Sequence, residues 1–550
     1  MEKVSDLTDL PTDVFLIVTN FLDARDIFRC LSVSKRWHKE FNDGPFLRDI
    51  LVRDYSRARE VRSLLTKESS ELELPQNKNS NEVPILLKNT FDKVVARYFA
   101  LKSGKPWSST ELMLHLPLKN PWANHNLIGN QYPVGRWSRY VIPGLTLPLR
   151  IRGSREERHV PTDLKETEWT YDAGLLVYYD LDVHAYVLLD IESNTTSIVP
   201  FSVKDQVVRR LRLKHSLLIV EWAERCPYHK LNDDEDVHRH FATAYDVLPA
   251  PKTFPWLPRW NATFRNEWKL HYLGFPLTPR DCWLSTHSPT HYAAYIWQPN
   301  RSSWGEDQPI ESLLIWDISQ PSPYRPSQDP TGESHSSLGP PLVKKLSYLD
   351  LDDLTIRQRD APSLRKIELD QGSVYFIEEG CDLERGMHVV YRPVSRRVHQ
   401  YCERIVGIPI IGSGPRWEDR RDDDSAPRVE CGSERSPESQ PLPEPRRASC
   451  WRYNNIYPGV RNQSIRDDPA DIEFDVVQHN IGCPEIWITS PSRGWSTRLD
   501  MRDIHYEWKE VAGDERWLLI QSKQELRILH FDREVKQGRS QLVELGLPDN

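Results

Sequence analysis

The sequence predicts an α+β multidomain fold, with a small all-α N-terminal part, a helical linker and a large all-β domain. Three observations support this prediction. The 550 residues exceed the usual size of one domain. The first hundred residues repeat apolar side chains at the helical period, whereas after residue 106 the apolar residues stand in short runs bounded by turn residues. The 42 prolines and 19 tryptophans favour many short strands over long helices in this later part.

Composition and charge exclude several classes of protein. A chain that is 38% hydrophobic and 28% charged is globular in composition, and a net charge of -8 disfavours a general nucleic-acid binder. No apolar run approaches the ~18 residues of a membrane span, and Met1 to Leu10 lacks the apolar core of a secretory signal. The eight cysteines form no Cys-x-x-Cys pair, which suits a reduced intracellular protein. We therefore expect no nucleic-acid partner, no membrane partner, and a cytoplasmic or nuclear location.

The first helix is expected to bury one apolar stripe. Its members follow the i, i+3, i+4, i+7, i+8 spacing of a single helix face, and they are Val14, Ile17, Val18, Phe21 and Leu22. Pro11 suits the first turn, and Asp13 lies near the positive end of the helix dipole. The pattern predicts a helix that begins at Pro11 and packs this stripe inward.

Three more short helices are predicted before residue 52. One begins at Asp23, a second covers about residues 34–42, and a third follows the break at Asn42 to Pro45. Their inward side chains are predicted to be Ile27, Cys30, Leu31, Trp37, Phe41, Phe46, Leu47, Ile50 and Leu51. So small a unit buries too little surface for a complete core of its own, so we expect it to need a partner surface.

Residues 6–50 resemble an F-box. The resemblance rests on the order and spacing of Leu10-Pro11-Thr12-Asp13-Val14, Ile17-Val18, Phe21-Leu22, Arg25-Asp26-Ile27, Cys30-Leu31 and Val33-Ser34-Lys35-Arg36-Trp37. In that family the motif binds the Skp-type adaptor of an SCF-type cullin-RING ubiquitin ligase, and the rest of the chain captures a protein substrate. Two departures are Ser34, where the family often has Cys, and the polar pair Thr19-Asn20, which is expected to weaken docking without abolishing it.

The resemblance implies a set of adaptor-binding residues. It assigns Leu10 and Pro11 to the adaptor contact at the start of the motif, and it places four further residues in the motif's apolar framework: Val14, Leu31, Val33 and Trp37. The alternative reading of the apolar stripes alone is a helical cap that packs on the rest of its own chain. The combination of motifs favours the F-box.

Residues 51–106 are predicted to form a helical linker that braces the F-box. Residues 53–74 are charged and compatible with a helix, and residues 76–81 break the pattern. A second helix has the buried stripe Phe91, Val94, Val95, Tyr98 and Phe99, and it ends near Ser103-Gly104-Lys105-Pro106. A rigid spacer suits a ligase, because substrate and ubiquitin donor must meet at a fixed distance.

Residues 107–550 are predicted to be a substrate-recognition domain, folded as a β-propeller with about six or seven irregular blades. The clearest strand pair is 175–180 with 185–191. Five further pairs resemble it, and two of them are looser copies. The three closer pairs are 217–222 with 244–247, 292–297 with 315–318, and 517–521 with 529–532. The two looser pairs are 374–377 with 388–391 and 475–477 with 485–489. Repeated antiparallel units that hide one face on the next unit are typical of radial β-repeats, and tryptophans would fill those faces. The spacing is irregular, so a β-sandwich or a pair of sheets remains the alternative.

Two segments are predicted to be disordered inserts, near 319–341 and 413–449. Both are rich in proline or charge and too poor in large apolar residues to offset their chain entropy. The second contains Ser436-Pro437 and Arg446-Arg447-Ala448-Ser449, which resemble kinase sites. Phosphorylation of this insert is one possible form of regulation.

The sequence contains no convincing catalytic motif. Gly-x-Ser-x-Gly, His-Glu-x-x-His, a Walker loop and Gly-x-Gly-x-x-Gly are all missing. Cys226, His229, His238 and His240 are possible metal ligands, but they lack regular zinc spacing, and the acidic run 232–236 between them is typical of a solvated loop.

We therefore expect no catalytic residue, no metal and no cofactor. The prediction is a non-catalytic substrate-recognition subunit of a ubiquitin ligase, whose partners are a Skp-type adaptor, through it cullin and RING subunits, and an unknown protein substrate. One alternative is an F-box-like scaffold that acts outside a ligase. A weaker one is a propeller enzyme with a helical attachment.

Overall fold

A computed structural model describes most of the helical part and most of the predicted strands. The described residues are 10, 12–19, 21–22, 24–30, 33–71, 82–114, 169–180, 182–232, 235–250, 259–277, 281–301, 308–330, 339–354, 356–359, 364–370, 372–379, 388–394, 397–411, 451–452, 472–477, 485–490, 493–500, 508–522 and 525–532. The predicted insert 413–449, with its kinase-like sites, lies outside them. Within these ranges no helix is both long enough and apolar enough to cross a membrane.

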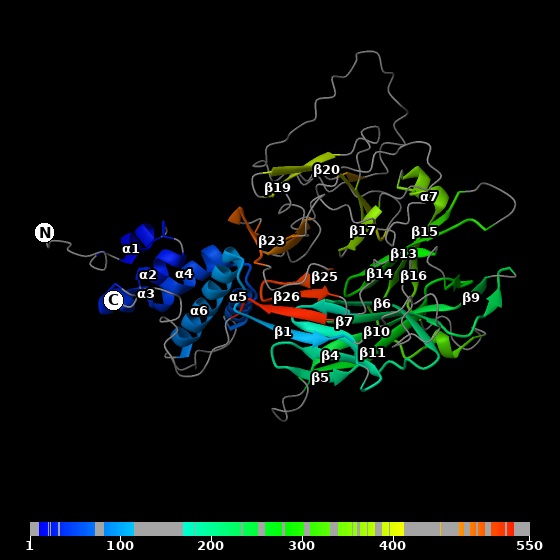
Figure 1. Ribbon diagram of the computed structural model, residues 1–550, viewed down its shortest axis with the longest axis horizontal. Helices are drawn as coiled ribbons and strands as arrows, with labels where there is room; N and C mark the ends of the chain where they lie inside the picture. The colour runs from blue at the N-terminus through cyan, green and yellow to red at the C-terminus, as the bar shows by residue number, and fades with distance from the viewer. Residues whose placement is uncertain are drawn as a thin grey trace, which may run out of the picture. The chain divides into compact units, whose positions relative to one another are not determined.

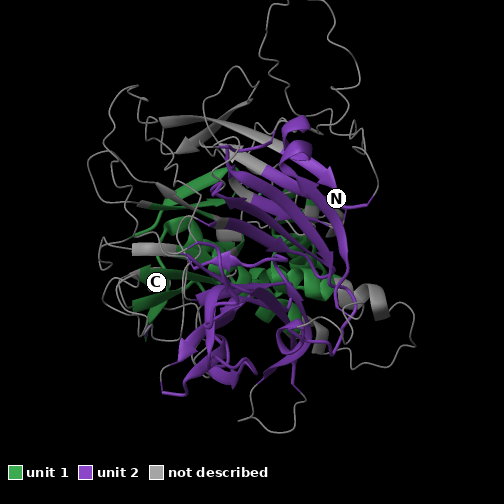
Figure 2. Cartoon of the chain, turned by 90° about the vertical axis from the view of Figure 1, so that its right-hand side faces the viewer, with its two compact units in different colours: residues 1–112, 469–476, 485–550 green, residues 113–468, 477–484 purple. Residues whose placement is uncertain are grey.

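The chain divides into two compact units (Figure 2). Unit 1 comprises residues 1–112, 469–476 and 485–550, and unit 2 comprises residues 113–468 and 477–484. Unit 1 thus combines the N-terminal helices with the C-terminal strands.

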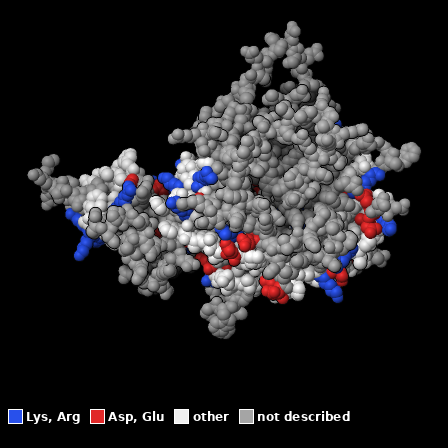
Figure 3. All heavy atoms as spheres, viewed as in Figure 1, with Lys and Arg blue, Asp and Glu red and all other residues white. Residues whose placement is uncertain are grey.

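Lys, Arg, Asp and Glu side chains of the described residues are interspersed on the face drawn in Figure 3.

Unit 1 begins with six helices. They are α1 (Thr12–Thr19), α2 (Ala24–Cys30), α3 (Lys35–Phe41), α4 (Gly44–Tyr55), α5 (Arg59–Glu71) and α6 (Glu82–Ser103). Ser34 caps α3, because its Oγ accepts a hydrogen bond of 3.1 Å from the amide of Trp37. Gly104 ends α6 at a positive φ of 68°, which lets the amide of Lys105 reach the carbonyl of Ala100 at 3.1 Å. Local sequence signals therefore set both of these helix ends.

Most of the apolar stripe of the first helix faces outward, so the prediction that it is buried is wrong except for Leu22, which is partly buried against the core of unit 1. Val14, Ile17, Val18 and Phe21 are exposed, whereas Phe15 between them is buried. The helical period was read correctly, but a sequence with two apolar faces does not say which face meets the core. The stripes of α4 and α6 do face inward as predicted, except for Phe99, which is exposed.

Two sheets complete unit 1. One has the strand order β1-β27-β26-β25 and the other the order β22-β23-β24. Their bounds are β1 (Ser108–Met113), β22 (Glu473–Val477), β23 (Glu485–Ser490), β24 (Trp495–Arg498), β25 (Trp508–Gly513), β26 (Trp517–Ser522) and β27 (Glu525–His530). In Figure 1 the blue strand β1 lies with the red strands β25 and β26. The first strand after the helices is therefore paired with the last strand of the described chain.

One hydrophobic core joins the helices and the strands of unit 1. Phe15, Phe41 and Phe46 from the first helices belong to the same buried cluster as Ile488 and Leu529 from the C-terminal strands. The three phenylalanine rings meet pairwise with centroids 5.1 to 5.5 Å apart. Such aromatic pairs contribute about 0.5–1.5 kcal/mol each beyond their buried area. The N-terminal helices therefore share their core with the end of the chain.

The described residues of unit 2 form four larger antiparallel sheets and a small one. The larger sheets have the strand orders β2-β3-β4-β5, β11-β10-β7-β6, β13-β14-β15-β16 and β17-β18-β20-β19, with β21 on β20, and the small sheet has the order β12-β9-β8. The bounds are β2 (Trp169–Asp172), β3 (Leu175–Asp180), β4 (Ala185–Asp190), β5 (Thr195–Ile198), β6 (Gln206–Lys214), β7 (Leu217–Glu224), β8 (His229–Lys230), β9 (Asp236–His238), β10 (His240–Pro249), β11 (Trp260–Lys269), β12 (Phe275–Pro276), β13 (Cys282–His287), β14 (His291–Gln298), β15 (Ile310–Asp317), η3 (Pro326–Gln328), β16 (Leu342–Ser347), α7 (Tyr348–Asp353), β17 (Leu364–Leu369), β18 (Ser373–Glu379), β19 (His388–Val394), β20 (Arg397–Pro409) and β21 (Trp451–Arg452).

Consecutive large sheets of unit 2 pack face to face. On β14, Tyr292 and Ala294 join one buried cluster with β7 and β10, whereas Ala293 and Tyr295 join another with β18 and β20. The alternation follows from the two-residue period of a strand. Each sheet therefore hides its faces on its neighbours in chain order, and buried tryptophans such as Trp283 fill the space between sheets.

The large all-β region is confirmed, but a β-propeller is not. Among the described strands no sheet closes on itself. The strands β3 and β4 pair as predicted, as do β7 with β10, β14 with β15, and β26 with β27. The predicted pairing of 374–377 with 388–391 is wrong, because both strands pair with β20, which the sequence pattern did not single out.

Part of the predicted insert 319–341 is ordered. The amide of Ser322 donates to the carbonyl of Arg265 on β11 at 2.9 Å, and the Arg325 guanidinium lies 3.7 Å from the centre of the Phe264 ring. These contacts hold residues 319–330 along β11. The prediction of disorder is wrong for this stretch, because local composition does not reveal backbone partners contributed by a distant strand.

Candidate docking site

The first helices of unit 1 present apolar side chains to solvent. Ile17 on α1 is 59% exposed, and Phe21 in the turn after α1 is 86% exposed. Val14, Val18 and Val33 are exposed as well. Exposed apolar groups in such number on one short segment are typical of an interaction surface. We call the set Val14, Ile17, Val18, Phe21 and Val33 the apolar face.

Inward-facing residues hold the apolar face in position. Phe15 and Thr19 are buried on the opposite side of α1. The Thr19 hydroxyl donates to the carbonyl of Phe15 at 2.9 Å, so this polar side chain is satisfied within its own helix. Thr19 therefore does not contribute a polar side chain to the apolar face.

The six predicted adaptor-binding residues occupy different environments. Leu10 and Trp37 are partly buried and pack against the core of unit 1, where the Trp37 ring stacks on Phe41 with centroids 5.5 Å apart. Val14 and Val33 are exposed on the apolar face. Pro11 and Leu31 lie outside the described residues. Their roles stay predictions, and the geometry adds Ile17, Val18 and Phe21, which the helical period had placed in the core.

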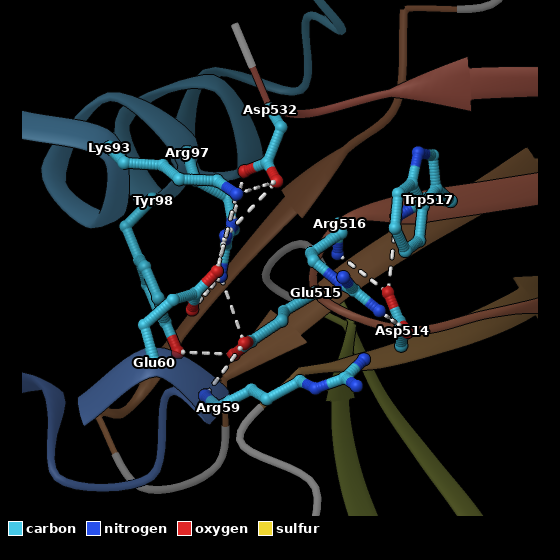
Figure 4. A network of polar contacts seen from close by, with 10 residues as sticks. All are labelled: Arg59, Glu60, Lys93, Arg97, Tyr98, Asp514, Glu515, Arg516, Trp517 and Asp532. Carbon is cyan, nitrogen blue, oxygen red and sulfur yellow. Dashed lines mark hydrogen bonds and ion pairs between the residues drawn. The ribbon is translucent and has the colours of Figure 1, made fainter. Parts of the chain in front are cut away.

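An arginine network joins α5 and α6 to the ends of the C-terminal strands of unit 1 (Figure 4). The Arg97 side chain on α6 is fully buried among three carboxylates. Its guanidinium donates to Glu60 at 2.5 and 2.9 Å, to Glu515 at 2.9 Å and to Asp532 at 2.5 Å. The Lys93 ammonium lies 3.4 Å from Asp532 and 3.6 Å from Glu60. Two cations thus meet three carboxylates contributed by α5 and by the C-terminal strand ends.

The carboxylates of this network differ in their protonation. Burial opposes ionisation of Glu60, but the hydrogen bonds and charge of Arg97 outweigh it and lower the Glu60 pKa to about 2. For Glu515 burial dominates, and with repulsion from Glu60 it raises the pKa despite the attraction of Arg97. The Arg97 pKa is raised by the surrounding carboxylates although burial opposes its charge. Arg97 is therefore held in its charged form, and Glu515 is more readily protonated than Glu60.

A second arginine, Arg493, links α4 and α6 to the C-terminal strands. The Arg493 guanidinium lies 4.2 Å from the ring centres of both Tyr55 on α4 and Tyr98 on α6. It also donates to the carbonyl of Asp54. The Tyr98 hydroxyl in turn donates to Glu515 at 3.1 Å. Cation–π contacts of this kind stabilise by about 0.5–2 kcal/mol. Together the two arginines tie α4, α5 and α6 to the C-terminal strands within unit 1.

The histidines and cysteine considered as metal ligands have other contacts. His240 is buried, with Nε2 3.0 Å from the Arg209 guanidinium and Nδ1 2.8 Å from the carbonyl of His238. His238 Nδ1 lies 2.9 Å from the carbonyl of Glu224, and Cys226 is exposed. Within the described part of the chain, no group of three or more His, Cys, Asp or Glu residues is placed to hold a metal ion.

The comparison with known families bears directly on these helices. Residues 7–52 match the family model described as F-box-like. The matched range contains α1 to α3, most of α4 and the whole apolar face. No curated protein matches the chain. The resemblance seen in the sequence is therefore confirmed for the N-terminal helices.

Proposed function

We propose that this chain, which carries an F-box-like domain at residues 7–52, is the substrate-recognition subunit of an SCF-type cullin-RING ubiquitin ligase. Its F-box-like domain would bind a Skp-type adaptor and, through it, cullin and RING subunits. Its β domain would bind a protein substrate. The chain would position the substrate, and other subunits would catalyse the transfer of ubiquitin. It would act in the cytoplasm or the nucleus.

The apolar face is the observation on which the proposal chiefly rests. Ile17 and Phe21 are largely exposed, although the same helix buries Phe15 in the core of unit 1. Covering a fully exposed aromatic or branched side chain of this size gains about 1.5–3 kcal/mol. An F-box-like domain with an uncovered apolar face has the surface that a protein partner requires.

The arginine network supports a rigid arrangement of α5, α6 and the C-terminal strands within unit 1. Arg97 binds Glu60 near the F-box-like domain and Asp532 at the end of β27. Transfer of ubiquitin is bimolecular, so holding the acceptor near the donor raises its rate. The buried ion pairs of the network limit motion within unit 1, which carries the F-box-like domain.

The substrate domain is proposed to be a β-propeller. Two features of the separate units support this. In unit 2 consecutive large sheets pack face to face, and in unit 1 strand β1 pairs in one sheet with β27. In a β-propeller, an early strand that joins the last sheet closes the ring, and a closed ring has few exposed strand edges. Strand β1 in the sheet with β27 fits this pattern.

Co-purification tests the proposal. Full-length chain expressed in its native cells should retain a Skp-type adaptor and a cullin, and the double variant Leu10→Ala, Pro11→Ala should lose both while the β domain stays folded. Adaptor without cullin would favour the scaffold function outside a ligase. Normal adaptor binding by the double variant would contradict the docking assignment.

A further inference from the structure

Strand β11 of unit 2 has an irregular outer edge. It ends the sheet β11-β10-β7-β6, so no described strand pairs with that edge. In its middle the register with β10 shifts, and Arg265 lies opposite no residue of β10, whereas Phe264 and Asn266 on either side do. Such bulges re-aim side chains and are common next to functional sites. Residues 319–330 lie along this bulged part of β11, and we call them the strap.

Three consecutive residues of β11 bind the backbone of the strap. The Arg265 guanidinium and the Asn266 amide donate to strap carbonyls at 2.6 and 3.1 Å, and the Glu267 carboxylate accepts from a strap amide at 3.0 Å. The carbonyl of Arg265 also accepts from the amide of Ser322 at 2.9 Å. Asn266 and Glu267 are buried although they stand on an edge strand. Because these bonds go to backbone groups, other extended segments can form them as well.

Two side chains of the strap make the contacts that depend on its sequence. The Arg325 guanidinium lies 3.7 Å from the centre of the Phe264 ring, and Pro326 beside it is buried. Three prolines between residues 321 and 326 favour an extended backbone and lower the entropy that the segment loses on binding. Phe264 and the three residues after it therefore suit an extended segment that contains proline and an arginine.

The strap does not satisfy this site completely. Asn266 Oδ1 is buried and has no hydrogen-bond partner among the described residues. An unpaired buried acceptor costs free energy, so a segment that offers an N–H to this oxygen gains a bond that the strap does not form. Within the strap, all of which is described, only Pro326 is buried. A segment that buries so little can open locally while the sheet stays folded.

We propose that residues 264–267 of β11 form the peptide-binding site of the substrate domain, that the strap occupies this site in cis, and that a substrate segment displaces it. The segment is extended and carries proline and an arginine, as the strap does. Its arginine takes the place of Arg325 on the Phe264 ring. This inference rests on the proposed function, because it names the class of substrate segment that the β domain captures.

A fluorescent peptide with the sequence of residues 319–330 tests the site. It is titrated into full-length chain, purified with its adaptor, and binding is followed by fluorescence anisotropy. In the natural chain the strap competes at an effective concentration on the order of millimolar, so we expect weak binding. The double variant Arg325→Gly, Pro326→Gly removes both specific contacts of the strap. It should bind the peptide at least about tenfold more tightly than the natural chain.

Matched controls separate the site from general effects on the chain. A peptide with Glu in place of its arginine should bind the double variant at least about tenfold more weakly, because the cation on the ring is lost. Adding Phe264→Leu to the double variant should weaken binding of the original peptide severalfold for the same reason. Gln328→Ala alone changes an exposed strap side chain and should bind like the natural chain. Circular dichroism and thermal melts check that each variant is folded.

Hydrogen exchange measures the opening of the strap directly. We expect strap amides of the natural chain to exchange at least about tenfold faster than amides of β10. Equal exchange of the two segments, equal peptide affinity of natural chain and double variant, or unchanged affinity for the Glu peptide would each overturn the site. The two proposals fail separately. A chain that retains adaptor and cullin but fails these tests overturns the site alone, whereas peptide binding by a chain that never retains a cullin overturns the ligase function alone.

Discussion

Arg97 on α6 binds Asp532 after β27 at 2.5 Å, across 435 positions of the chain. Glu60 and Glu515 complete a buried cluster around the same guanidinium. We expect Arg97→Met to lower the free energy of unfolding of unit 1 by about 3–5 kcal/mol, because it leaves three carboxylates without their main partner. Urea unfolding of the full chain, with hydrogen exchange of α6 amides as a local probe, measures the loss.

The control for Arg97 is Arg29→Met. Arg29 pairs with Asp26 at 3.2 Å, and both side chains are about half exposed. Exposed pairs contribute about 0–1 kcal/mol, so this variant should unfold almost like the natural chain. Equal stability of Arg97→Met and Arg29→Met would contradict the bracing role of the network.

Glu60→Gln should reveal a pH dependence through the Glu60 pKa. The folded value of about 2 lies below the ordinary value near 4.5, so ionised Glu60 contributes stability that is fully present above pH 4.5. That contribution, about 3 kcal/mol from the size of the shift, is lost as the pH falls from about 4.5 to about 2. The stability difference between natural chain and variant should therefore shrink over this window, as followed by hydrogen exchange of α5 and α6. Glu111→Gln, at a half-exposed carboxylate on β1, serves as the control.

Glu515→Gln should show the opposite trend. The Glu515 pKa is raised by burial, so the stability that its protonated form contributes is present below the ordinary value near 4.5 and is lost as the pH rises through the raised folded value. The variant should therefore gain stability relative to the natural chain as the pH increases from about 4 toward neutrality. A difference that stays constant over this range, in the same hydrogen-exchange measurement, would show that Glu515 does not titrate in the network.

Phe21→Ala and Phe15→Ala should separate docking from folding. Phe21 is 86% exposed, whereas Phe15 is 7% exposed inside the cluster with Phe41 and Phe46. The first variant should keep its melting temperature and lose at least tenfold in affinity for the purified adaptor, measured by calorimetry. The second should lose about 3–5 kcal/mol of stability. If the Phe21→Ala variant binds the adaptor with unchanged affinity, Phe21 is not part of the adaptor contact.

The sequence predicted features that depend on neighbours in the chain. The spacing of Phe46, Leu47, Ile50 and Leu51 predicted the buried face of α4, and all four are buried. The order of short motifs predicted the F-box-like domain. The residue runs also predicted most of the strands, because a strand and its hairpin partner lie close together in the sequence.

The features that the sequence did not predict depend on distant partners. Arg97 stands in a helix like many other arginines, and nothing local identifies Glu515 or Asp532 as its partners. The outward direction of Ile17 and Phe21 depends on the core that Phe15 enters, which includes strands from the other end of the chain. The small sheet around Val237 likewise requires β8 and β12 to meet, although two strands of the main sheet separate them in the sequence.

Pairing of β1 with β27 affects how the chain is made. The helices emerge from the ribosome first, but the strands that complete their core follow only after residues 113–468. At ~5–20 residues per second, roughly 20–80 s pass between synthesis of α6 and synthesis of its strand partners. During that interval the charged side chain of Arg97 has no carboxylate from the C-terminal strands to bind. A nascent or prematurely terminated chain thus lacks the finished core of unit 1, and the apolar face reaches its braced form only when translation has delivered the last strands.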